Sequence, residues 1–157
     1  MQELAVKTTS EQETILLAER LATYLNPGTV ITLTGDLGVG KTTFTKGIAQ
    51  GLGIEATVTS PTFTIIKEYT NCDIPLYHID AYRLEGSDED IGFEEYFYGD
   101  GISVIEWPQF IEDFLPDQYL EIIITYVDIN SRKIHLISRG NADSKILKQL
   151  KDNHKDS

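Results

Sequence analysis

The segment at 35–42, with the sequence GDLGVGKT, constrains the fold of this chain more than any other stretch. It matches G-x-x-x-x-G-K-[ST], in which the glycines let the backbone turn tightly so that successive N–H groups surround an anion. An apolar, β-branched run at 30–33 precedes it, and a helix-compatible run at 41–52 follows it. A helix that begins at the loop adds the positive end of its dipole to the anion site. The sequence therefore predicts a strand, a phosphate-binding loop and a helix in this order.

The loop residues define a candidate nucleotide site. Lys41 is expected to neutralise charge on the β- and γ-phosphates, and the hydroxyl of Thr42 is expected to hold Mg²⁺. Asp36 is an acid inside an anion site, so we expect its side chain to point outward. The motif residues expected around the phosphates are Gly35, Asp36, Leu37, Gly38, Val39, Gly40, Lys41 and Thr42.

Two later apolar runs, at 76–80 (LYHID) and 102–106 (ISVIE), each end in an acid, Asp80 and Glu106. Ligands of α/β sheets bind at the carboxyl ends of the strands, so we expect at least one of these acids at the metal. The other interpretation is a solvated strand end or a helix cap, and the residues alone leave the division of roles open. His78 is interpreted as a hydrogen-bonded core histidine, and Trp107 either as a packing residue or as a flank of the site.

A polar turn, TSPT at 59–62, follows the loop helix. Thr59, Ser60 or Thr62 could sense a γ-phosphate through its hydroxyl, as mobile switch segments do. A Ser-Pro turn that leads into a strand explains the same residues equally well.

The remaining pattern predicts one α/β domain, in which strands alternate with helices early and pair locally late. Ser10 and Glu13 form a capping box before a first helix. The expected fold is a single P-loop NTPase domain over 1–140, with a mainly parallel central sheet flanked by helices and an antiparallel C-terminal hairpin. A C-terminal helix and a charged tail follow at 141–157. Strands are expected at 62–69, 76–80, 102–106, 119–129 and 133–138.

The net charge of −12 is concentrated in one stretch. Residues 80–121 sum to −12, with Arg83 as their one cation, and the rest of the chain is neutral. An acidic chain is disfavoured as a direct, strong binder of tRNA or other nucleic acid. The single Cys excludes an internal disulfide, and no apolar run approaches the ~18 residues of a membrane span, so we expect a cytoplasmic protein without a membrane partner. The acidic stretch is interpreted as a solvated face or, alternatively, as a docking surface for a basic partner.

Four blocks of sequence occur in a specific order: GDLGVGKTTFTKG, SPTFTIIKEY, LYHIDAYRL and VIEW. With the chain length, they resemble the TsaE family of small bacterial P-loop ATPases over about residues 8–138. The resemblance implies an ATP- and Mg²⁺-dependent ATPase required for threonylcarbamoylation of adenosine in tRNAs that read ANN codons. It also implies a protein partner, the TsaB–TsaD complex.

The resemblance assigns roles residue by residue. It implies that 38–43, including Thr43, cradle the phosphates. It makes Asp80 a Walker-B-like acid and Glu106 a metal-linked or catalytic acid. The implied catalytic residues are Lys41, Asp80 and Glu106, the implied metal ligands are Thr42, Asp80 and Glu106, and weaker nucleotide contacts fall on Ser10 and Thr62.

Three rival functions follow from the same loop. A P-loop small-molecule kinase usually clamps two phosphoryl groups with clustered arginines, and the four arginines of this chain are scattered. A GTPase needs a guanine-reading N-K-x-D tetrad, which the sequence lacks. A nucleotide-gated interaction module without significant hydrolysis of its own and a P-loop small-molecule kinase are kept as the alternatives.

Overall fold

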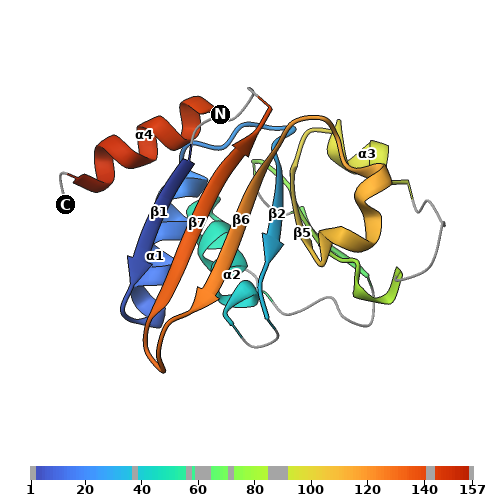
Figure 1. The fold of residues 1–157 in the computed structure, drawn as a ribbon. Helices are drawn as coiled ribbons and strands as arrows, with labels where there is room; N and C mark the ends of the chain where they lie inside the picture. The colour runs from blue at the N-terminus through green and yellow to red at the C-terminus, as the bar shows by residue number, and fades with distance from the viewer. Residues whose placement is uncertain are drawn as a thin grey trace.

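The backbone forms one mixed sheet with the strand order β1-β7-β6-β2-β5-β4-β3 (Figure 1). The computed structural model describes residues 3–36, 39–55, 58, 65–70, 73–84, 92–140 and 144–155. The four central strands, β6, β2, β5 and β4, run parallel, and the neighbours at both edges are antiparallel. The strands are β1 (Glu3–Thr8), β2 (Val30–Thr34), β3 (Ile66–Tyr69), β4 (Leu76–Asp80), β5 (Ile102–Glu106), β6 (Tyr119–Tyr126) and β7 (Arg132–Arg139).

The predicted α/β class, the parallel centre and the C-terminal hairpin of β6 and β7 are confirmed. Two edge features were not predicted. Strand β1 pairs antiparallel with β7, and β3 pairs antiparallel with β4, so the sheet is more mixed than expected. The side chains of β1 alternate between exposed and covered, but the strand is short and only Leu4 and Val6 on its covered face are apolar, which is a weak signal in the sequence.

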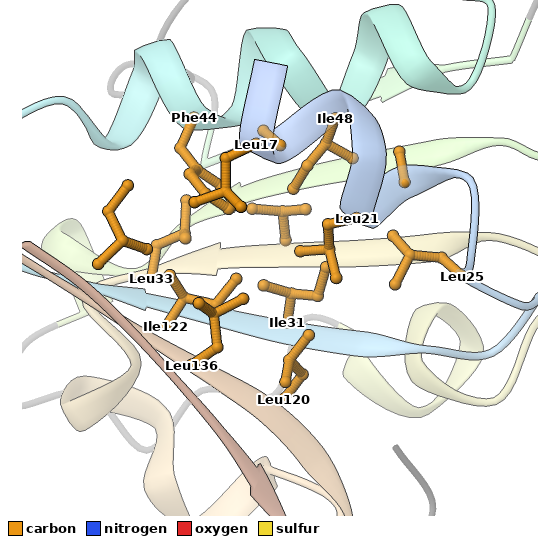
Figure 2. Packing of buried hydrophobic residues seen from close by; sticks show 14 of the residues in the cluster. Leu17, Leu21, Leu25, Ile31, Leu33, Phe44, Ile48, Leu120, Ile122 and Leu136 are labelled. Carbon is orange, nitrogen blue, oxygen red and sulfur yellow. The ribbon is translucent and has the colours of Figure 1, made fainter. Parts of the chain in front are cut away.

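Helices α1 (Glu11–Ala22) and α2 (Lys41–Gly51) lie together behind the strands in Figure 1. Their buried side chains, such as Leu21 of α1 and Ile48 of α2, point toward Ile31 of β2 in the main core (Figure 2). The two helices approach closely because Gly47 faces α1. A Cβ atom at Gly47 would lie 2.5 Å from the Cβ of Ala18, so only glycine allows this spacing.

A second apolar cluster covers the other face of the sheet, below α3 (Phe93–Phe97) and the 3₁₀ segments η1 (Tyr82–Leu84) and η2 (Pro108–Phe114). Helix α4 (Ser144–Lys155) packs against α1, β1 and β7 through three buried side chains, Ile146, Leu147 and Leu150. Within the described residues, no helix combines the length and the apolar content that crossing a bilayer requires.

Candidate functional site

The glycine-rich loop connects β2 to α2, as the sequence predicted, and two of its glycines are required by geometry. Gly40 caps α2 with φ 116° and ψ 21°, a left-handed conformation that strains any residue with a side chain. A Cβ atom at Gly35 would lie 2.7 Å from the carbonyl oxygen of Ile124 and 2.7 Å from Cγ1 of Val39. The described loop residues include Asp36, which is exposed as expected, whereas Leu37 and Gly38 lie outside the described residues.

Lys41, the first residue of α2, is 5% exposed. Its Nζ donates a hydrogen bond to the carbonyl of Gly35 at 3.0 Å and lies 4.0 Å from the centroid of the Trp107 ring. Burial lowers the pKa of Lys41, while the nearby charges of Glu106, Asp80 and, least, Asp36 raise it. The ammonium is therefore poorly hydrated and held beside carboxylates, a state in which an added anion would be attracted strongly.

The two predicted acids lie next to each other. Asp80 and Glu106 are partners in the parallel register of β4 and β5, and Glu106 is also paired with Leu33 of β2. The side chains of Asp80 and Glu106 therefore point to the same face of the sheet, and they are only 4% and 5% exposed. Because β2 leads into the loop, the tertiary structure brings both acids to the strand ends beside Lys41.

Each carboxylate already has a hydrogen-bond donor. Oδ1 of Asp80 accepts from the backbone N–H of Tyr82 at 3.0 Å. Oε2 of Glu106 lies 2.7 Å from Nε2 of His78, which is fully buried. Nδ1 of His78 has no hydrogen-bond partner among the described residues. His78 is thus a buried, hydrogen-bonded histidine, as the sequence indicated, although one of its two ring nitrogens has no partner among the described residues.

Trp107 follows Glu106 in an unusual backbone conformation, with φ 58° and ψ 51°. Left-handed conformations are costly for bulky residues and occur where the surrounding structure enforces them, often at functional sites. Here the conformation places the indole over Lys41, and the ring also packs at 5.1 Å from Tyr82 and 6.2 Å from Phe110. The interpretation of Trp107 as a packing residue is thus confirmed, and the ring also lies against Lys41 of the candidate site.

A cavity of about 420 Å³ lies beside the loop. It is lined by the start of α1, including Ser10, by Gly40 and Thr43, and by the turn between β6 and β7. Nε of Arg132, the first residue of β7, donates to the carbonyl of Val39 at 2.8 Å and so ties this turn to the loop. Sequence reasoning missed Arg132, since an arginine after a hairpin turn carries no signal of such a contact.

The cap of α1 differs in one detail from the expected capping box. Oγ of Ser10 accepts from the backbone N–H of Glu13 at 3.1 Å, as predicted. The Glu13 carboxylate, however, reaches the backbone N–H of Thr9 at 3.2 Å, and also the Thr9 hydroxyl, instead of the N–H of Ser10. Ser10 therefore lies at the cavity with its oxygen already engaged by the helix.

The switch candidates Thr59, Ser60 and Thr62 lie outside the described residues, as do positions 85–91 of the acidic stretch. Of the stretch that the structure does describe, Glu94 and Glu95 are exposed in the first turn of α3. The described residues contain no group of three or more His, Cys, Asp or Glu side chains that could hold a metal by themselves. Mg²⁺ typically binds through one or two carboxylates together with waters and phosphate oxygens, and Asp80, Glu106 and Thr42 offer oxygens of this kind.

The molecule has the architecture of a single-domain P-loop protein. It combines an α/β sheet, a glycine-rich loop between β2 and α2, a buried lysine after the loop and two acids at adjacent strand ends. The sequence model of the family described as "Threonylcarbamoyl adenosine biosynthesis protein TsaE" matches residues 8–134. The chain therefore belongs to the TsaE family.

Similar proteins span nearly the same length. The tRNA threonylcarbamoyladenosine biosynthesis protein TsaE of Bacillus subtilis is 47% identical over 150 residues, which cover 96% of this chain and 95% of that protein. The protein of the same name from a Nostoc species is 41% identical over 131 residues, 80% of each chain. The crystal structure of Bacillus subtilis YdiB superposes with a TM-score of 0.86 at 40% identity, covering 98% of this chain and 97% of that one.

Proposed function

We propose that this protein is a Mg²⁺-dependent ATPase that acts in the formation of threonylcarbamoyladenosine in tRNA. The observation that supports an ATPase best is Lys41, a buried ammonium beside the glycine-rich loop, with Glu106 and Asp80 as its strongest charged neighbours. Family membership supports the pathway, because the relatives bear the name of this tRNA modification.

The residues fit a nucleotide and its metal by their chemistry. The left-handed Gly40 allows the tight turn into α2, Gly35 lets the loop pack closely against β6, and the N-terminus of α2 favours an anion there. When bound, MgATP would supply the phosphoryl group and the charge that the metal partly neutralises. Lys41 would bind the β- and γ-phosphates, the Thr42 hydroxyl would hold the metal, and Trp107 would limit the access of water to the Lys41 ammonium.

We assign one of the two acids to metal binding and the other to orientation of the attacking water. Experiment decides which acid has which role. Glu106 is the stronger electrostatic partner of Lys41, whereas Asp80 accepts a backbone N–H at the start of η1. The cavity beside the loop, lined by Ser10 and Thr43, is proposed to take the nucleobase. The absence of an N-K-x-D tetrad from the sequence favours adenine over guanine.

We further propose that the TsaB–TsaD complex is the protein partner. The chain carries a net charge of −12, which opposes direct binding to the phosphate backbone of tRNA. We therefore expect this protein to act on tRNA modification by binding a partner protein rather than the tRNA itself. The deciding experiment measures phosphate release from MgATP by the pure protein, alone and with TsaB–TsaD. Binding of ATP without hydrolysis in either state would favour the nucleotide-gated module, and transfer of phosphate to a small acceptor would favour the kinase.

Nucleotide binding is expected to change the fluorescence of Trp107, the one tryptophan of the chain. The indole now contacts the Lys41 ammonium, and an incoming phosphate would compete for that charge. Titration with MgATP, followed by tryptophan emission, measures the effect. Trp107→Phe should remove the signal while calorimetry still detects binding, and an unchanged emission at saturating MgATP would contradict the contact between nucleotide and Lys41.

The affinity for ATP is expected to fall at alkaline pH. Burial holds the pKa of the Lys41 ammonium below its usual range in the free protein, and bound phosphates would raise that pKa again. Binding then takes up a proton at any pH between the two pKa values, so affinity decreases as the pH rises through the pKa of the free protein. Calorimetry in buffers of different ionisation enthalpy detects this proton. Lys41→Arg, whose guanidinium stays charged, should bind without taking up the proton.

A further inference from the structure

His78 is a buried titratable residue of β4. Its side chain is 0% exposed, lies two residues before Asp80 and points to the same face of the sheet. Nε2 lies 2.7 Å from Oε2 of Glu106, while Nδ1 has no hydrogen-bond partner among the described residues. Leu76, on the same face, belongs to the apolar core. A polar ring that leaves one nitrogen unpaired is a poor core residue, so its presence needs another reason.

The contact with Glu106 supplies that reason. A glutamate side chain has several rotatable bonds, and Glu106 lies where Lys41 attracts it electrostatically. The contact of Nε2 with Oε2 restricts the rotation of the carboxylate and does not engage Oε1. His78 is itself held rigidly, because it is buried within a strand that is hydrogen-bonded on both sides. The ring can therefore act as a fixed reference for the Glu106 carboxylate.

We propose that His78 is a positioning residue that holds the carboxylate of Glu106 in the orientation used for ATP hydrolysis. The inference rests on the proposed function, because it assumes that Glu106 orients the metal or the water. His78 makes no contact of its own with the nucleotide in this scheme. It acts on turnover through Glu106, and it leaves the binding of phosphates by Lys41 and the loop unchanged.

The kinetic test compares His78→Leu with His78→Gln. Leucine fills the site without a donor and should lower kcat about 10- to 100-fold, the range typical of lost outer-shell partners, with little change in KM for ATP. Glutamine carries an amide N–H that reaches a similar position, and it should restore part of the loss. Leu76→Val is the matched control, since it removes packing from the same strand and face without touching Glu106, and it should leave kcat near that of the wild type.

A double-mutant cycle separates positioning from general damage. In a Glu106→Ala background, His78→Leu should cause little further loss of kcat, because the side chain through which it acts is already gone. An equal loss in both backgrounds would overturn the proposal, as would a parallel fall in kcat and in thermal stability that Leu76→Val reproduces. No change in kcat on His78→Leu would overturn it as well.

A measurement on the nucleotide-free protein tests the contact without activity. The proposal requires a proton on Nε2 that is buried and hydrogen-bonded to Glu106, so proton NMR should show a ring N–H resonance protected from exchange with water. His78→Leu should remove this resonance, and Glu106→Ala should remove its protection. If the wild type hydrolyses ATP but lacks the resonance, the positioning role of His78 is wrong and the proposed function is unaffected. If the wild type does not hydrolyse ATP, alone or with TsaB–TsaD, the proposed function fails and the positioning role fails with it, whatever the NMR result.

Discussion

Replacing Lys41 with alanine is expected to abolish productive ATP binding and to lower kcat/KM by about 100- to 1,000-fold, the cost of removing one well-placed charge from an active site. The ammonium is buried, so little water screens its attraction to the phosphates. Its loss also leaves Asp80 and Glu106 without the nearby Lys41 charge, so that only the metal would offset these two acids beside the bound phosphates. Both effects act in the same direction.

Phosphate release and calorimetric titration with MgATP measure this prediction. Lys46→Ala is the matched control, because it removes a lysine from the same helix, outside the loop and the cavity. The control should bind and hydrolyse as the wild type does. Normal hydrolysis by Lys41→Ala would show that the loop is not the nucleotide site.

Replacing Glu106 with glutamine or alanine is expected to reduce kcat by about 100- to 1,000-fold and to change the affinity for ATP far less. A carboxylate that orients the metal or the attacking water stabilises charge that develops only in the transition state, so its loss appears in turnover. Glutamine keeps the size of the side chain and an oxygen for the His78 contact. The difference in kcat between Glu106→Gln and Glu106→Ala therefore separates the contribution of the side chain's size and oxygen from the contribution of its charge.

Single-turnover hydrolysis and a separate binding titration distinguish the two effects. The same measurements on Asp80→Asn show which of the two acids has the larger effect on the rate. They also show which acid has the larger effect on the dependence on Mg²⁺. Glu112→Gln serves as the control, since Glu112 is an exposed acid of η2 and its loss changes the net charge equally. Loss of binding with no separable effect on the rate would make Glu106 a ligand of the ground state.

Much of the site follows from local sequence rules. The turn at Gly40 needs a positive φ, which glycine supplies, and the apolar runs that end at Asp80 and Glu106 have the length and composition of buried parallel strands. Parallel strands place their carboxyl ends at one edge, so an acid at each end was expected near the loop. These inferences needed no knowledge of which strands are neighbours.

Other features depend on which strands pair and in which register. The contact between His78 and Glu106 exists because β4 lies beside β5 in a register that aligns Asp80 with Glu106. A different register would leave His78 facing another residue. The bond from Arg132 to Val39 likewise joins residues 93 positions apart in the chain, and no local pattern encodes such a distance.

The sequence by itself determined the loop, the helix that follows it and the two acid-ended strands, because backbone sterics and hydrophobic periodicity act over a few residues. The tertiary structure alone decided that Lys41 is buried against Trp107, that Glu106 is held by His78 and that the β6–β7 turn closes on the loop. These contacts are set by strand order and side-chain packing, which a chain acquires only when all its elements assemble together.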